Sequence, residues 1–100
     1  MNQTQIYSLL GLANRAGKIV TGEDLVLKEI RNKRAKLVII AEDASENTMK
    51  KFTDKCSYYQ VPLKKVNSRV TLGQSIGKPE RVLVAVLDAG FAEKLKSLFD

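Results

Sequence analysis

The chain has 100 residues, which is enough for one hydrophobic core and too few for two. Hydrophobic residues make up 44% of it, which excludes the composition of a disordered protein. Lys and Arg (17) outnumber Asp and Glu (11), giving a net charge of +6. Such an excess favours a polyanionic partner, namely RNA, DNA or an anionic membrane. We expect a single domain over residues 1–100.

The residue inventory narrows the classes of function further. The longest apolar run, Leu37–Ala41, is far shorter than the roughly 20 residues of a membrane span, and the first residues lack the pattern of a signal peptide. A lone cysteine, Cys56, excludes an internal disulfide. The absence of histidine removes the usual general base and the commonest metal ligand. We therefore expect a cytoplasmic protein with no cofactor, no metal, no membrane partner and no catalytic residues.

Periodicity and capping signals predict helices and strands in alternation. Gly17 is placed to stop the first helix, and Pro62 indicates an edge strand or a strand start. The continuous apolar run over 37–41 is typical of a strand covered on both faces. In chain order, we predict a helix from a Thr4 cap to about Ala16, a strand over 19–21, a helix over 23–32, a strand over 37–41, a helix from Ser45 to about Tyr59, a strand over 61–66, a short helix over 68–76, a strand over 81–87 and a helix after Asp88.

This alternation implies an α/β fold, a three-layer α/β/α sandwich around a small mixed sheet of about four strands. Gly73–Pro79 looks faintly like a phosphate loop. Its spacing is one residue short, however, and Pro79 stands where the motif needs Ser or Thr, so we interpret it as a turn.

The second helix carries the best candidate for a binding surface. Gly22 leaves the N–H groups of its first turn uncapped, and such helix ends bind phosphate. On a helical wheel Leu25 points with Lys28 and away from the buried stripe, so it is available to pack on an unstacked base. An incidental surface leucine explains it equally well. Asp24 and Lys28 are spaced i,i+4 and can instead pair with each other.

Other conspicuous residues have simpler explanations. Cys56 is interpreted as a small buried hydrophobe rather than a nucleophile, because no base is adjacent. Tyr58 and Tyr59 are interpreted as core or rim residues rather than base-stacking platforms, because the alternating aromatic pattern of a single-strand reader is missing.

Several segments, in order and at matching spacing, resemble the family of ribosomal proteins L-seven-Ae and L-thirty-e, which binds kink-turn RNA. The resemblance runs from Gly17 to about Gly90 and is carried by Ala35–Asp43, Val61-Pro62 and Leu72–Gly77. The opening Leu10–Lys18 and the short length are most similar to the short bacterial, YlxQ-like branch.

The resemblance implies an RNA site at the start of the second helix. There the family motif falls on Gly22, Glu23, Asp24, Leu25 and Lys28. Gly22 and Lys28 match it, whereas Asp24 replaces an Asn and Leu25 replaces a Glu. Because ionised Asp only accepts hydrogen bonds and Leu makes none, each lost base contact costs roughly 1–3 kcal/mol of discrimination. Weaker or altered kink-turn selectivity is expected, with recognition of a different RNA element as the alternative.

The resemblance also implies a second contact region in the loop before the last strand, Gly77-Lys78-Pro79-Glu80. Lys78 and Glu80 depart from the mostly apolar family loop, which favours contact with the RNA backbone. Met49 either lines a pocket for an extruded base or belongs to the core. The residues expected to contact phosphates and to supply most of the affinity are Lys18, Lys28, Arg31, Lys33 and Arg69.

The leading hypothesis is therefore a non-enzymatic RNA-binding protein of the ribosomal type, a monomer that recognises a folded or kinked RNA. Ribosomal, messenger and small regulatory RNAs all fit this expectation, as do a permanent ribosome component and an assembly factor. A protein-interaction adaptor that uses the Leu25 face is the alternative. An enzyme, such as a fragment of an RNA-modifying one, is disfavoured by the lack of a nucleophile–base pair and of a cofactor motif.

Overall fold

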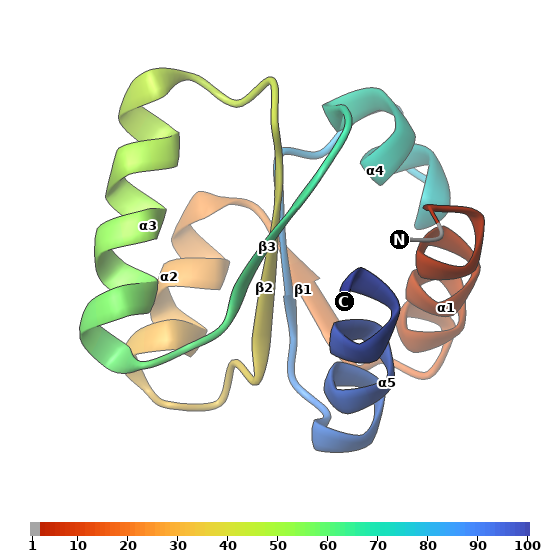
Figure 1. Ribbon diagram of the computed structural model, residues 1–100, viewed down its shortest axis with the longest axis horizontal. Helices are drawn as coiled ribbons and strands as arrows, with labels where there is room; N and C mark the ends of the chain where they lie inside the picture. The colour runs from red at the N-terminus through yellow and green to blue at the C-terminus, as the bar shows by residue number, and fades with distance from the viewer. Residues whose placement is uncertain (1–2) are drawn as a thin grey trace.

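The computed structural model describes residues 3–100, which form five helices and four strands in alternation. The elements are α1 (Gln3–Arg15), β1 (Ile19–Thr21), α2 (Glu23–Arg31), β2 (Leu37–Ala41), α3 (Glu46–Tyr59), β3 (Leu63–Val66), α4 (Arg69–Ser75), β4 (Leu83–Val86) and α5 (Ala89–Phe99). Figure 1 shows three layers, with α2 and α3 on one face of the sheet and α1, α4 and α5 on the other. The predicted α/β/α sandwich with a small mixed sheet is confirmed.

The sheet has the strand order β1-β4-β2-β3. β2 pairs in parallel with β3, and β4 lies between β1 and β2, antiparallel to both. Val86 of β4 is thus opposite Ile19 on one side and Leu37 on the other. It follows that β1, β2 and β3 end, and β4 begins, at the same end of the sheet. This end is at the top of Figure 1 and is named the upper end; the opposite one is the lower end.

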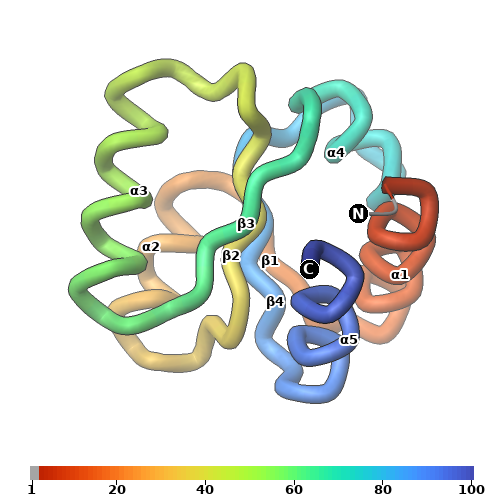
Figure 2. Tube along the Cα trace, viewed as in Figure 1, coloured from red at the N-terminus to blue at the C-terminus, as the bar shows by residue number. Residues whose placement is uncertain are grey.

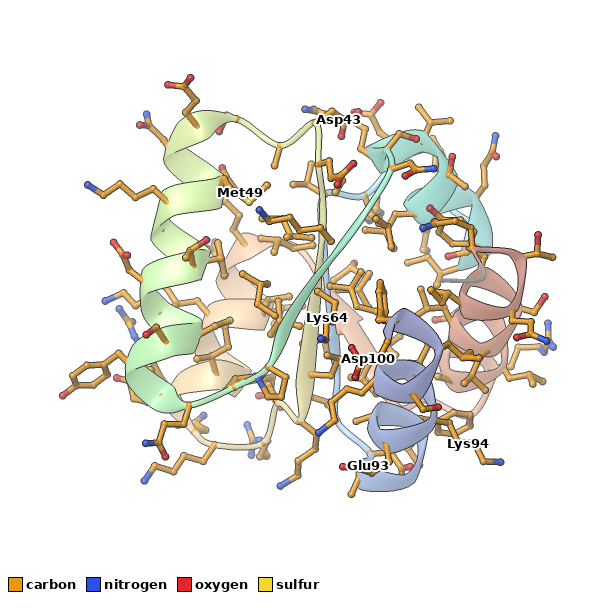
Figure 3. All side chains as sticks on the ribbon, in the orientation of Figure 1. Asp43, Met49, Lys64, Glu93, Lys94 and Asp100 are labelled. Carbon is orange, nitrogen blue, oxygen red and sulfur yellow. The ribbon has the colours of Figure 1, made fainter. Side chains whose placement is uncertain are left out.

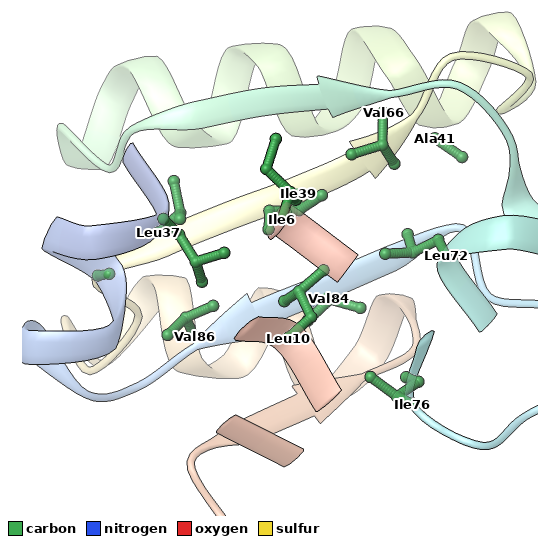
Figure 4. Packing of buried hydrophobic residues seen from close by; sticks show 12 residues of the cluster. Ile6, Leu10, Leu37, Ile39, Ala41, Val66, Leu72, Ile76, Val84 and Val86 are labelled. Atoms are coloured by element: carbon green, nitrogen blue, oxygen red, sulfur yellow. The ribbon is translucent and has the colours of Figure 1, made fainter. Parts of the chain in front are cut away.

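β2 is buried along its whole length because helices cover both of its faces. Successive side chains of a strand point to opposite faces. Leu37, Ile39 and Ala41 therefore pack into the core beneath α1, α4 and α5, which Figure 4 shows from close by. Val38 and Ile40 pack into the core beneath α2 and α3. Each large side chain buried in this way contributes roughly 1.5–3 kcal/mol, so β2 anchors both cores.

Among the helices whose preceding residue the structure describes, three begin with a side-chain cap. Ser45, Ser68 and Asp88 each accept a hydrogen bond from the backbone N–H three residues later, at 3.2, 3.2 and 2.9 Å. α2 begins differently, because its N-cap is Gly22, with φ 91° and no side chain to accept a bond. The start of α2 at the upper end is therefore left uncapped.

Some element bounds differ from those predicted. Thr4, expected as a cap, lies inside α1. The third strand was expected from Val61 but begins after Pro62, which has no N–H to donate; its carbonyl still accepts from Val38 at 2.9 Å. The last strand is shorter than predicted, so Arg81 lies in the loop before β4. In the part of the chain that the structure describes, no helix is long and apolar enough to cross a membrane.

Candidate nucleic-acid interface

Four segments that are far apart in sequence meet at the upper end of the sheet. They are the start of α2, the β2–α3 loop, the β3–α4 loop and the loop before β4. The course of the chain through these segments can be traced in Figure 2. Backbone hydrogen bonds join them: the Gly22 amide donates to the Leu83 carbonyl at 3.4 Å, and the Arg81 amide donates to the Arg69 carbonyl at 3.0 Å. The four segments therefore form one continuous surface, although they are far apart in the sequence.

The start of α2 is open to solvent. Gly22 is exposed, and beyond its two chain neighbours no atom lies within 4 Å of the position that a Cβ would take. A ligand can therefore approach the backbone, and the first-turn N–H groups and the helix dipole offer it partial positive charge. Glu23 and Asp24 stand in the same turn and repel phosphate. A nucleobase edge that carries N–H donors fits this turn better than a phosphate does.

Leu25 and Lys28 continue this surface along the outer face of α2. Leu25 is 53% exposed, while Val26 and Ile30 are fully buried, so the predicted orientation of Leu25 is confirmed. The alternative in which Asp24 pairs with Lys28 is not observed, because no ion pair joins them within residues 3–100. The Lys28 ammonium is exposed and available to a ligand.

Two arginines at the upper end are committed to contacts within the protein. The Arg69 amide donates to the Asp43 carboxylate at 3.0 Å, and its guanidinium lies 3.6 Å from the same oxygen. Figure 3 shows Asp43 at the top of the sheet. The Arg81 Nε donates to Thr21 Oγ1 at 3.4 Å, and its Nη1 donates to the Glu80 carbonyl at 2.6 Å. Arg69 therefore fixes one loop rather than offering a free charge, and Arg81, which sequence reasoning assigned to a strand, connects β1 to the loop before β4.

The loop before β4 lies directly on α4. A Cβ on Gly73 would stand 2.4 Å from the Glu80 Cα, so only glycine permits this approach. The Lys78 amide donates to the Gly73 carbonyl at 2.9 Å, and Gly77, with φ 75°, turns the chain. Gly77 and Lys78 are both exposed. The structure thus places them at the upper end, beside the loop that Arg69 holds.

Three predicted site residues do not join the upper end. Lys18 precedes β1, and its carbonyl accepts from the Leu87 amide at 2.8 Å. Arg31 ends α2, and Lys33 follows it. All three lie at the lower end. The helix α2, about 14 Å along its axis, separates Gly22 from Arg31 and Lys33, and the strand β1 separates it from Lys18. The predicted residues therefore form two groups at opposite ends of the sheet.

Two other residues singled out from the sequence lie between α3 and the sheet. Cys56 is 2% exposed, and burial raises the pKa of its thiol to about 11, so it stays protonated and unreactive at neutral pH. Met49 is half-buried against the same core, on the sheet side of α3 in Figure 3. Among residues 3–100, no group of carboxylate and cysteine side chains is placed to hold a metal ion.

Comparison with known proteins places this architecture in context. Residues 4–96 match the family described as the ribosomal protein L7Ae/L30e/S12e/Gadd45 family. Over its full 100 residues and all of the relative, the chain is 67% identical to a Bacillus subtilis (strain 168) protein named RNA-binding protein YlxQ. The predicted resemblance to the YlxQ-like branch is thereby confirmed.

Solved structures agree with this placement. A protein of unknown function from Bacillus halodurans C superposes with a TM-score of 0.95 at 49% identity, over 98% of this chain and 99% of that one. The 15.5kD RNA binding protein of Giardia lamblia superposes with a TM-score of 0.83, over 99% of this chain and 90% of that one. Its identity is 19%, so this second match shows the fold alone.

Proposed function

We propose that this chain, which belongs to the ribosomal protein L7Ae/L30e/S12e/Gadd45 family, binds a folded RNA at the upper end of its sheet. The family is a non-enzymatic one, which confirms the expectation that the protein is not an enzyme. The observation that carries the proposal is the uncapped, unobstructed start of α2, which is one of the four segments that converge at the upper end. A full-length relative named for RNA binding supports the class of ligand.

The chemistry of the upper end favours a bent RNA with accessible base edges over a regular duplex. Gly22 lets a nucleotide approach the backbone closely, and Asp24 accepts from a base N–H, as guanine provides. Leu25 packs against the face of a base that the bend has unstacked. Lys28 and Lys78 contact the flanking phosphates. A kink-turn, with its tandem G·A pairs, is the RNA element that we propose to fit these groups.

In this proposal the protein acts in the cytoplasm as a monomer, as a single domain over residues 1–100 and without a cofactor. Two phosphate contacts give a modest dependence on salt. With a slope of about 0.9 in log affinity for each contact, raising the salt from about 50 to about 200 mM weakens binding roughly tenfold. The remaining affinity comes from contacts with the bases.

A protein-interaction adaptor is the second candidate, and the 53% exposure of Leu25 is the observation that favours it. An exposed leucine adds apolar area that a partner protein can bury. The substitution Leu25→Glu separates the two functions. It weakens an apolar protein contact, whereas it restores a polar base contact to the RNA site.

A gel-shift titration tests the proposal directly. One RNA is a kink-turn, and its matched control is the same duplex with the G·A pairs replaced by Watson–Crick pairs, each at two salt concentrations. We expect the kink-turn to bind at least tenfold more tightly than the control at both. Equal, salt-sensitive binding to both RNAs contradicts recognition of the bend. Binding to neither RNA contradicts the RNA function and favours the adaptor.

A further inference from the structure

The lower end of the sheet is strongly basic, and the proposed function does not use it. Residues 31–36 hold four basic side chains and no acidic one. The nearby carboxylate, Glu29, is already bound by Arg34 through hydrogen bonds of 2.9 and 2.6 Å. On the far side of β4, Lys18 adds a further exposed positive charge. The Asp88 carboxylate, which also lies at this end, accepts a hydrogen bond from the Phe91 amide as the cap of α5. The upper end, in contrast, carries Glu23, Asp24, Glu42, Asp43 and Glu80 beside its basic residues.

The helices α2 and α3 both end at the lower end, on the same face of the sheet (Figure 1). A hollow lies between the segments that follow these two helix ends. Lys33 and Gln60 have left-handed backbone angles, φ 60° and 59°. These angles turn the chain toward the sheet just beyond the ends of α2 and α3. The Lys36 amide donates to the Val86 carbonyl at 2.8 Å, so this loop is fixed to β4. The hollow is lined by Lys33, Ala35, Lys36, Tyr59, Gln60 and Val61. It therefore combines two exposed lysines with an aromatic wall.

Tyr58 directly precedes Tyr59, which lines this hollow. Tyr58 is 79% exposed, which corrects its interpretation as a core or rim residue. Its ring meets the Tyr59 ring edge-on, with the centroids 4.9 Å apart and the planes at 79°. Tyr59 packs on the core beneath α2 and α3, so one edge of the Tyr58 ring meets a side chain that the core supports. Asp54 and Lys55, one turn earlier on α3, carry opposite charges that offset each other. The net positive charge near the hollow therefore comes from Lys33 and Lys36.

We propose that the lower end binds an unpaired RNA strand, with one base stacked on Tyr58 and the neighbouring phosphates held by Lys33 and Lys36. Stacking on an exposed ring needs a base that is not already stacked, so an unpaired strand fits better than a duplex. An acidic protein segment would use the lysines but would gain little from the ring. The class of ligand follows the proposed function, but the site is separate from it. The protein would thus join two RNA segments, one at each end of its sheet.

Fluorescence anisotropy with a short labelled oligouridine tests this site. Tyr58→Ala should weaken binding about tenfold, as loss of one stacked base does, while Tyr58→Phe keeps the ring and the affinity. The double variant Lys33→Asn, Lys36→Gln should also weaken binding and flatten its salt dependence. Asn is chosen at Lys33 because it tolerates the left-handed backbone there. Unchanged affinity of Tyr58→Ala, whose side chain is too exposed to matter for folding, would overturn the proposal.

A second arm separates this site from the upper end. Lys28→Ala should leave oligouridine binding unchanged, and Tyr58→Ala should leave kink-turn binding unchanged. The protein saturated with kink-turn RNA should still bind labelled oligouridine with the same affinity. Competition between the two RNAs would overturn the lower site. Failure of kink-turn binding alone would refute the proposed function and leave the oligouridine result standing as support for the lower site.

Discussion

Replacing Gly73 by Ala tests whether the loop before β4 is fixed by direct contact with α4. In α4 the added Cβ would stand 2.4, 2.7 and 2.8 Å from the Cα, C and N atoms of Glu80. These are backbone atoms, so they cannot rotate away as a side chain would. Overpacking of this kind costs typically about 1–3 kcal/mol, and the rigid neighbour places it near about 3. Helix propensity returns up to about 1 kcal/mol, because Ala favours a helix over Gly. We expect a net loss of about 2 kcal/mol.

Urea unfolding followed by circular dichroism measures this loss, with Gln74→Ala as the matched control. Gln74 is the exposed neighbour of Gly73 in the same helix, and its replacement should change stability by less than about 0.5 kcal/mol. For a chain of 100 residues, the Gly73→Ala loss corresponds to a fall in Tm of roughly 8–16 °C. A Gly73→Ala variant as stable as the wild type, or more stable, would refute the reasoning from the contact with Glu80.

Three further predictions concern groups whose environment the structure defines. Hydrogen bonding by Arg34 lowers the pKa of Glu29 in the folded state. The bond therefore stabilises the protein fully above the pKa of Glu29 in the unfolded state, about 4.3. This stabilisation is lost as the pH falls through the lower pKa of Glu29 in the folded state. The stability difference between wild type and Glu29→Gln, measured by urea unfolding, should shrink below about pH 4; a difference that is the same at every pH would contradict this. The Cys56 thiol, with its pKa raised to about 11, should react slowly with a disulfide reagent at neutral pH and rapidly in concentrated urea, and fast labelling of the folded protein would show that the thiol is accessible. Asp43→Ala removes the carboxylate that accepts from the Arg69 amide and faces its guanidinium, so urea unfolding should show a loss of about 1 kcal/mol; no loss would mean that this contact is not formed in solution.

The elements themselves could be predicted from the sequence, because their signals are local. The uninterrupted apolar run over 37–41 indicates a strand covered on both faces, and β2 has these bounds. Ser45 and Asp88 stand where caps are needed, and α3 and α5 begin directly after them. The placement of β4 between β1 and β2 could not be predicted in the same way. It depends on pairings between distant residues, such as Val20 with Ala85, that no local pattern encodes.

The candidate site shows the same division. The uncapped start follows from the lack of a side chain on Gly22, the outward orientation of Leu25 follows from helical spacing, and the structure has both. The sequence could not reveal that Arg69 is held by Asp43, 26 residues away. It also could not separate the basic residues into two ends, because that requires the direction of each strand in the sheet. The exposure of Tyr58 was missed for a related reason, since two adjacent tyrosines at a helix end give no clear buried face.

The most direct test of the central claim is the affinity of kink-turn RNA for wild type, Lys28→Ala and Lys94→Ala, measured side by side. Both substitutions remove one exposed lysine, but Lys28 lies in the last turn of α2, on the same exposed helix face as Leu25, whereas Lys94 lies on α5, where Figure 3 shows it low on the opposite face. We predict that Lys28→Ala weakens binding several-fold and lowers the salt slope by nearly one, while Lys94→Ala leaves both unchanged. Equal effects of the two substitutions, or no effect of Lys28→Ala, would contradict an RNA site at the start of α2.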